Sequence, residues 1–324
     1  MNKSLKICAL LLALTAILGG LPIFAATAYQ TYSYSYDGVQ VNSPDAYVPY
    51  KTVNSAAMGL KTAIMTPGDI CVDPDDNVYI SDTGLNRVIA LDPYYNLRFE
   101  ISTFVNGEGV EDALNGPTGL FVSSTKIYVC DTKNARIVVF DRDGNFVRIL
   151  EKPKAKVLAD NSQYQPIAVA VDTAERIYVI SATTYMGVMV LDSAGNFQSF
   201  IGAQAVTANA LELLWRRFQT PQQRAKSQKY ISTEFNNITI DADNFIYVTT
   251  SSISEDNMQE SIKSNSSTYS PVKRLNALGE DVMARNGFFG PGGEVETLSY
   301  SRDSKAILGA SIIVDVAVSP DNTW

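Results

Sequence analysis

Two carboxylates and one amide of this chain, those of Asp69, Asn237 and Asp315, each stand immediately before an apolar residue in a run that is typical of a strand. Carboxylate and amide oxygens are the ligands that a hard cation such as calcium takes in proteins. The chain has no histidine, which excludes a Ser-His-Asp triad, a Cys-His pair and a histidine-ligated zinc. Any catalysis would therefore use carboxylates, amides, Lys, Arg or Tyr, together with a bound cation. The alternative is that these side chains cap backbone amides where strands begin.

The three side chains belong to a repeat that occurs four times and begins a fifth time. Each copy has an apolar run closed by a polar residue, a short turn, an apolar-Tyr-apolar run and two further strands. The tyrosines that mark the four copies are Tyr79, Tyr128, Tyr178 and Tyr247. Repeats of this length, with about four short strands each, are typical of a β-propeller. The sequence therefore predicts an all-β protein with four blades and the start of a fifth at 312–318.

Apolar runs bounded by turn residues predict the strands of each blade. The predicted strands are 70–72, 78–81, 87–91 and 97–102 in blade one; 120–122, 127–130, 136–140 and 145–150 in blade two; 168–171, 177–180, 188–191 and 197–201 in blade three; and 238–241, 245–248, 273–276 and 281–284 in blade four.

The first 60 residues do not follow the repeat. Residues 1–28 combine two lysines, an apolar run too short to span a bilayer and an Ala-Thr-Ala cleavage pattern, which is typical of a secretory signal peptide. Residues 29–60 carry tyrosines at every second position and an Asp-Gly turn. They predict a packed strand or hairpin, or else a free arm, ahead of a propeller that spans 61–324.

Two insertions interrupt the propeller pattern. Residues 203–230 include apolar side chains three and four positions apart, which predicts a helical insertion between blades three and four. Residues 251–270 are rich in Ser and Asn with no apolar period, and we predict a long flexible loop there. Both segments are candidates for contact with a partner, although the helix could equally cover the groove between two blades.

The net charge of the chain limits the classes of partner that it can bind. The formal net charge is −8, and loss of Lys3 and Lys6 with the signal peptide brings it to about −10. Such a surface repels phosphate backbones, so we expect no nucleic-acid partner. No run after the signal approaches the 18 apolar residues of a membrane helix, so no membrane span is predicted in this stretch. We expect a monomeric protein that is secreted or lies at a bacterial cell surface.

Two cysteines remain after the signal peptide, Cys71 and Cys130. Export permits a disulfide, but the two residues occupy different positions in their blades, which disfavours facing geometry. We predict buried free thiols.

The connections between the second and third strands of blades one and two resemble those of NHL-repeat propellers, which carry Asp-x-x-Asn-x-Arg there. Residues 131–136 (Asp-Thr-Lys-Asn-Ala-Arg) match in full, whereas residues 82–87 (Asp-Thr-Gly-Leu-Asn-Arg) have Leu85 in place of the usual Asn, and blade three has Gly187 in place of Arg. The resemblance covers about 61–324. It implies six blades when complete, so we expect this chain to be part of a longer protein. Aspartate and arginine at this spacing are predicted to be structural, because they cap turn amides and backbone carbonyls.

The chain resembles gluconolactonase-like six-bladed hydrolases more distantly. That resemblance implies a divalent cation held by Glu, Asn and Asp at the start of the inner strands, often five residues before the strand-ending Asp. Of the residues at that position here, only Asn236 is a ligand type; one position further along stand Asp69, Asn237 and Asp315. The candidate ligand-binding residues are therefore Asp69, Asn236, Asn237 and Asp315, with no resident cofactor expected and with calcium or another divalent cation as the alternative.

The expected function is non-enzymatic: binding of a protein or a glycan through the channel face and the two insertions. One alternative is a metal-dependent, lactonase-like hydrolase that uses the carboxylates at the channel mouth. Another is a structural module of a larger, membrane-anchored surface protein.

Overall fold

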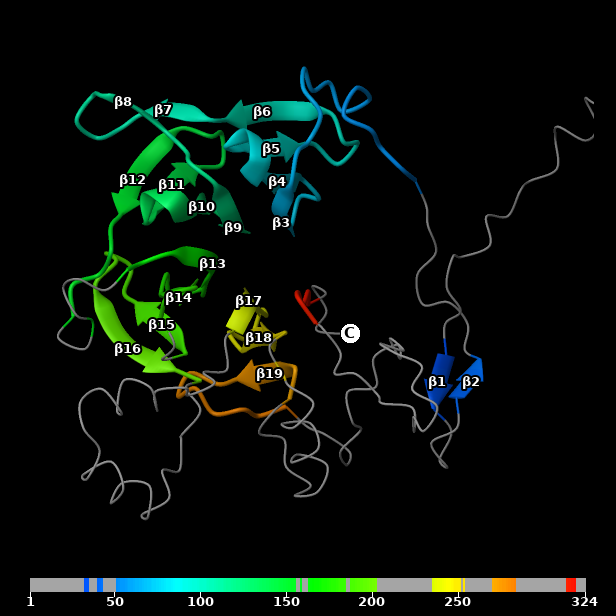
Figure 1. The fold of residues 1–324 in the computed structure, drawn as a ribbon, viewed down its shortest axis with the longest axis vertical. Coiled ribbons are helices and arrows are strands. Elements are labelled where there is room, and N and C mark those ends of the chain that lie inside the picture. The colour runs from blue at the N-terminus through cyan, green and yellow to red at the C-terminus, as the bar shows by residue number, and fades with distance from the viewer. Residues whose placement is uncertain are drawn as a thin grey trace, which may run out of the picture. The chain divides into compact units, whose positions relative to one another are not determined.

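The protein is described from a computed structural model, which covers residues 32–34, 40–42, 51–155, 158, 163–184, 187–202, 235–251, 253, 270–283 and 313–318. Residues 1–53 and 54–324 form two separate units. In the first unit, β1 (Tyr32–Tyr34) and β2 (Gln40–Asn42) pair antiparallel (Figure 1), with Tyr32 opposite Asn42. The two strands form a hairpin within 29–60, and whether it packs on the propeller or stays a free arm remains a prediction.

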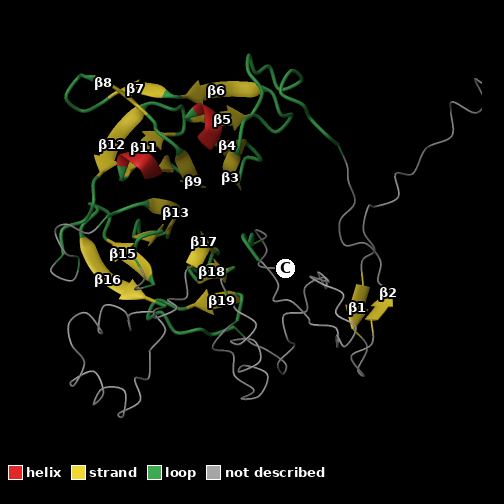
Figure 2. Cartoon of the chain, viewed as in Figure 1, coloured by secondary structure: helices red, strands yellow, loops and turns green. Residues whose placement is uncertain are grey.

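Besides one two-stranded hairpin, the described part of the second unit contains four antiparallel sheets of three or four strands that follow one another along the chain (Figures 1 and 2). The prediction of an all-β propeller with four blades is confirmed. The strands of blade one are β3 (Pro67–Val72), β4 (Val78–Asp82), β5 (Arg87–Leu91) and β6 (Leu97–Ile101); those of blade two are β9 (Pro117–Val122), β10 (Lys126–Asp131), β11 (Arg136–Asp141) and β12 (Phe146–Leu150); those of blade three are β13 (Pro166–Val171), β14 (Ile177–Ser181), β15 (Val188–Leu191) and β16 (Phe197–Ile201); and those of blade four are β17 (Phe235–Ile240), β18 (Ile246–Thr250) and β19 (Val272–Leu275).

The inner strands β3, β9, β13 and β17 start two or three residues earlier than the apolar runs suggested. Their first residues pair across a bulge, as where Pro67 lies opposite Asp82 and the register then shifts before Asp69. The bulge adds one residue that the alternating pattern does not show. The fourth strand predicted at 281–284 is reduced to a single bridge between Leu275 and Asp281 in the described residues.

The core lies between neighbouring blades, because the face of each sheet packs on the next one. Tyr79 and Val88 of blade one pack with Leu120 and Val138 of blade two, and the same arrangement continues into blades three and four. The anchors Tyr79, Tyr128, Tyr178 and Tyr247 are all buried, at 0 to 5% exposure. These equivalent positions confirm the repeat, since one blade alone would leave its apolar face in water.

The segments that precede the inner strands of blades one and two cover apolar side chains of the outer strands. Before blade one, Met58 and Leu60 cover the outer strands. Before blade two, a hairpin of β7 (Thr103–Val105) and β8 (Glu111–Ala113) places the Phe104 ring between those of Phe140 and Phe146, with both centroid distances 5.3 Å. The sequence analysis did not predict this hairpin.

Residues 313–318, the predicted first strand of blade five, lie beside β17 without a strand assignment. The Val314 carbonyl accepts hydrogen bonds from Asn236 Nδ2 at 2.7 Å and Thr249 Oγ1 at 3.4 Å. The Ser81 hydroxyl of blade one donates to the Thr118 carbonyl of blade two in the same way. The segment therefore takes the place of a fifth inner strand, while among the described residues no strand pairs with it.

Several predictions concern other parts of the chain. The signal peptide, the helical insertion at 203–230 and most of the loop at 251–270 lie outside the described residues. Within the described residues, no helix is long and apolar enough to cross a membrane. Both cysteines are free, as predicted, and Cys130 is buried. Cys71 is only half-buried, so burial is confirmed for Cys130 alone, although Cys71 packs against the core between blades one and two. Ile70 and Val72, on the other face of β3, are 58% and 57% exposed, because no described blade covers that face.

Candidate functional site

Three of the four predicted ligand-binding residues, Asp69, Asn237 and Asp315, make one and the same local contact. The side-chain Oδ1 of each accepts the N–H of the residue that follows it, at 2.8, 2.7 and 2.6 Å respectively. This contact caps the amide where the chain enters an inner strand. The capping alternative raised from the sequence is therefore confirmed for all three.

The same residues also connect neighbouring inner strands. Asp69 Oδ2 accepts the Leu120 N–H at 2.9 Å, and Asn237 Nδ2 donates to Asp315 Oδ1 at 2.6 Å. Blade two has Gly119 at the equivalent position, where an added Cβ would lie 2.4 Å from the Ile167 carbonyl oxygen. The position held by Asp69, Gly119 and Asn237 lies so close to the inner strand of the next blade that a polar side chain there can form a hydrogen bond to that strand.

The carboxylates of Asp69 and Asp315 lie within electrostatic reach of each other. Burial raises the pKa of Asp69 from 3.8 to about 6; the N–H groups of Leu120 and Ile70 oppose this shift, and the charge of Asp315 adds to it. Burial also raises the pKa of Asp315, against the hydrogen bonds from Val316 and Asn237. The structure thus brings Asp69, Asn237 and Asp315 together at one end of the inner strands, while Asn236 instead donates to Val314.

A calcium site needs six to eight oxygen ligands. The side-chain oxygens at this place are turned toward backbone N–H groups, and the Asn237 amide nitrogen faces Asp315. Across the described ranges, no three Cys, Asp or Glu side chains gather so that they could hold a metal ion. The described residues do not form a calcium cage, and a ligand-binding role for the four residues stays a prediction.

The Asp and Arg of the NHL-like runs form buried ion pairs. Arg87 Nε lies 2.9 Å from Asp82 Oδ2, and Arg136 Nε lies 2.8 Å from Asp131 Oδ2, with both carboxylates fully buried. The other oxygen of each Asp accepts a backbone N–H of the segment that precedes its blade, at 2.8 and 2.6 Å. The arginines donate to carbonyls of the same segments. The predicted structural role is confirmed.

A polar groove of about 590 Å³ lies between the rims of blades one and two, and we refer to it as the rim groove. Its polar lining includes Asn86 after η1 (Thr83–Leu85), Glu111 and Asp112 of β8, Asn115 before β9 and Asn134 of η2 (Thr132–Asn134). Arg136 holds Asp112 through two bonds of 2.7 and 2.9 Å and lowers the pKa of that carboxyl.

Other polar atoms of the rim groove have no partner among the described residues. These are the Glu111 carboxylate, the Asn86 amide nitrogen and the Asn115 amide oxygen; the Asn86 amide oxygen, by contrast, accepts the Gly116 N–H at 2.7 Å. Asn86 is held in the left-handed region, at φ 53°, by the turn that ends η1. The groove thus offers a carboxylate, an amide donor and an amide acceptor on a fixed backbone.

Sequence reasoning missed most of the rim groove. Asn86 and Asn134 belong to the NHL-like runs, but Glu111, Asp112 and Asn115 come from the unpredicted hairpin and the segment after it. The signal that could have revealed the hairpin is Asn106-Gly107 with Gly109, between Phe104-Val105 on one side and Val110 on the other. Gly109 has φ 77° and closes that turn.

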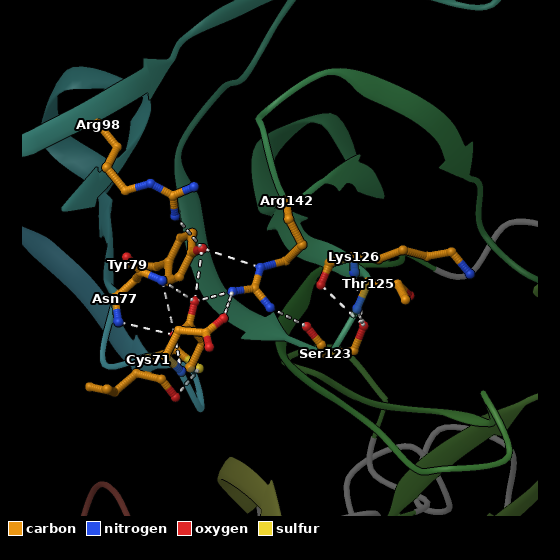
Figure 3. Close-up of polar contacts among 11 residues, drawn as sticks. Cys71, Asn77, Tyr79, Arg98, Ser123, Thr125, Lys126 and Arg142 are labelled. Atoms are coloured by element: carbon orange, nitrogen blue, oxygen red, sulfur yellow. Dashed lines mark hydrogen bonds and ion pairs between the residues drawn. The ribbon is translucent and has the colours of Figure 1, made fainter. Parts of the chain in front are cut away.

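A second polar cluster lies at the opposite ends of the inner strands (Figure 3). In blade one, Asp73 Oδ2 accepts the Tyr79 hydroxyl at 3.1 Å and is paired with Arg142, which comes from blade two. Arg142 Nε and Arg98 Nη1 both donate to the Tyr79 oxygen, at 3.3 and 3.2 Å. We call this set of carboxylate, tyrosine hydroxyl and guanidinium the turn unit of a blade.

No family model and no curated protein matches this chain. Among solved structures it is similar to virginiamycin B lyase from Staphylococcus aureus, with 12% identity over 77% of this chain and 60% of that one and a TM-score of 0.37. It is also similar to a streptogramin B lyase, with 14% identity over 68% of this chain and 55% of that one and a TM-score of 0.38.

A gluconolactonase from Xanthomonas campestris matches with 18% identity over 68% of this chain and 61% of that one, at a TM-score of 0.36. The chain therefore spans 55 to 61% of the length of these solved structures. Likeness at this level says nothing about activity. What the coordinates of this chain show by themselves is a β-propeller of four blades.

Proposed function

We propose that this chain is an NHL-type propeller, secreted or held at a cell surface, that binds a protein or a glycan without turning it over. The observation that carries the proposal is the rim groove, where Glu111, Asn86 and Asn115 present hydrogen-bonding atoms with no partner among the described residues. Polar groups on a rigid backbone of this kind suit the hydroxyls of a sugar or the amides of a peptide loop. The NHL assignment is supported by the ion pairs Asp82–Arg87 and Asp131–Arg136.

The rim groove is held by interactions that do not depend on a ligand. Asn134 Nδ2 donates to the Ala113 carbonyl at 3.1 Å and to Asp131 Oδ2 at 2.9 Å. Arg136 fixes Asp112 from the other side. Because the backbone around the groove is ordered by these contacts, little conformational entropy would be lost on binding.

The test is a binding screen of the mature chain against immobilised glycans and peptides, followed by titration of the hits. Glu111→Gln and Asn115→Ala should each weaken a groove ligand by roughly tenfold, since hydrogen bonds to charged or buried groups have about that value. Glu108→Gln, at the exposed tip of the same hairpin, is the matched control and should leave binding unchanged. Hits whose affinity is indifferent to all three changes would reject the groove as the binding site.

One observation favours the hydrolase alternative: Asp69, with its pKa raised to about 6, is suited to exchange a proton near neutral pH. A panel of lactones with calcium or manganese tests it. Metal-dependent turnover that Asp69→Asn abolishes, with the fold intact by circular dichroism, would replace the binding proposal with the hydrolase. We expect no turnover above the uncatalysed rate.

A further inference from the structure

The turn units of blades one, three and four share one arrangement. An aspartate ends the inner strand, its Oδ1 accepts two N–H groups of the turn, and its Oδ2 accepts the hydroxyl of the anchor tyrosine. The tyrosine-to-aspartate distances are 3.1 Å for Asp73, 3.0 Å for Asp172 and 3.2 Å for Asp241. A guanidinium also reaches each Oδ2, from Arg142, Arg176 and Arg274 respectively.

Blade two departs from this arrangement at one residue. Ser123 follows the last paired residue of β9, and the turn to Tyr128 is one residue shorter than in the other blades. The Ser123 hydroxyl accepts the turn N–H groups of Thr125 and Lys126, at 3.3 and 3.0 Å. It thereby replaces Oδ1 of the aspartate, but no atom replaces Oδ2.

The tyrosine and the cations of the unit are nevertheless present in blade two. Arg148 of β12 lies in the same cross-strand row as Tyr128, with Val139 between them. Burial raises the pKa of Tyr128, and the charge and hydrogen bond of Arg148 oppose this shift. Arg148 Nε is buried without a hydrogen-bond partner, as is Arg274 Nε in blade four, but Arg274 donates through Nη2 to Asp241. Within the described residues, no carboxylate accepts a hydrogen bond from Arg148 or from the Tyr128 hydroxyl.

The charges around this place do not cancel. Lys126 Nζ is paired with Glu175 Oε1 of the blade-three turn at 2.7 Å. Glu175 also lies within electrostatic reach of Arg148. Two cations therefore share one partly exposed carboxylate, whereas each of the other turn units has an aspartate of its own.

We propose that the turn of blade two binds a carboxylate group from outside the chain, in the place that an aspartate side chain fills in the other blades. Arg148 and the Tyr128 hydroxyl donate to it, as Arg274 and Tyr247 do to Asp241 in blade four. Lys126, 24% exposed, lies on the solvent side of the site. The ligand is a small free carboxylate or an acidic side chain of a partner protein.

The test titrates the mature chain with isotopically labelled acetate and follows binding by NMR. Chloride at equal ionic strength is the comparison anion. Acetate should bind saturably, and chloride at the same ionic strength should not displace it. In Arg148→Met its affinity should fall at least roughly tenfold, because a charge-assisted hydrogen bond is lost. In the matched control Arg98→Met, which alters the donor to Tyr79 in a unit that has its own aspartate, acetate affinity should not change.

A second variant keeps the test decisive if Arg148→Met does not fold. Ser123→Asp supplies the carboxylate from within the chain and should abolish acetate binding while the circular dichroism spectrum is retained. A short acidic peptide forms the other arm: binding of the peptide but not of acetate would assign the carboxylate to a partner protein. The proposal fails if neither ligand binds more tightly than chloride, or if acetate binding survives both Arg148→Met and Ser123→Asp.

Discussion

Blades two and three contain the same four strands, yet they bury their carboxylate at opposite ends. Blade two has the Asp131–Arg136 pair beside the segment that leads into the blade, and Ser123 at the turn. Blade three has Ser181 at the first place, with its hydroxyl accepting the Gln165 N–H at 3.1 Å, and Asp172 at the turn. A hydroxyl and a carboxylate can thus satisfy the same backbone amide. At both ends the carboxylate is paired with a guanidinium, and the hydroxyl is not.

The largest effect should come from breaking the blade-two pair. Asp131→Ala leaves the Arg136 guanidinium, 10% exposed, without one of its two carboxylates, and should lower the free energy of unfolding by about 3 kcal/mol. Ser181→Ala at the equivalent place in blade three removes one neutral hydrogen bond and should cost about 1 kcal/mol. Urea denaturation of both variants measures the difference. Equal losses would contradict the contrast between the two blades.

Asp69 sharpens the comparison, because it is a buried carboxylate that has no cation among its hydrogen-bond partners. Its pKa is about 6 in the folded chain and near 3.8 when unfolded, so the folded state binds the proton more tightly between these values. The stability that Asp69 contributes therefore falls as pH rises from about 4 to 6, by on the order of 2 kcal/mol.

This pH dependence is checked by urea unfolding of Asp69→Asn and the unmodified chain at several pH values. The stability gap between them should shift in favour of the variant as the pH passes through that window, and then stay constant. A gap that is independent of pH would mean that the Asp69 carboxyl titrates alike in both states.

Removing the anchor tyrosine hydroxyl should lower stability more in blade three than in blade two, and this difference should be smaller than the one above. Tyr178→Phe removes a 3.0 Å hydrogen bond to the Asp172 carboxylate and should cost about 1.5 kcal/mol. Tyr128→Phe removes a hydroxyl that no carboxylate accepts within the described residues, and should cost less than about 0.5 kcal/mol. Both rings are equally buried, so thermal or urea unfolding compares the hydroxyls alone. A larger loss for Tyr128→Phe would refute the assignment of the turn units.

The smallest effect concerns the contact that joins the two blades. Lys126 and Glu175 form a 2.7 Å pair in which Glu175 is 52% exposed. Lys126→Met should change stability by less than about 1 kcal/mol, and added salt should reduce the difference further. A loss of several kcal/mol at high salt would show that the pair is not a surface interaction.

The sequence was sufficient for the blades because their signal is local and repeated. Each anchor tyrosine stands in a run of apolar residues, and burial of such runs between neighbouring sheets follows from the repeat. The Asp131–Arg136 pair was equally predictable, since its two members lie five residues apart on paired strands. The bulge at the start of each inner strand was not, because the extra residue breaks the alternation that marks a strand.

The candidate site was less predictable than the fold, for a physical reason. Asp69, Asn237 and Asp315 do come together, but their oxygens face backbone amides of adjacent strands, and this depends on the distance between blades. The rim groove joins residues of two blades and a hairpin, so no short run of sequence contains it. The proposed carboxylate site in blade two follows only from a comparison of the contacts made by the four turns between inner strand and anchor tyrosine.

Equivalent positions in successive blades differ only in which partners are present. Introducing the same change, Ser to Asp, at Ser123 and at Ser181 tests this most directly by urea unfolding. We predict that Ser123→Asp stabilises the chain by about 1 kcal/mol, because the new carboxylate would accept hydrogen bonds from Tyr128 and Arg148. Ser181→Asp should destabilise it by about 2 kcal/mol, because that residue is 5% exposed and Gly187 stands where an arginine would be needed. Changes of the same sign at both positions would contradict the account.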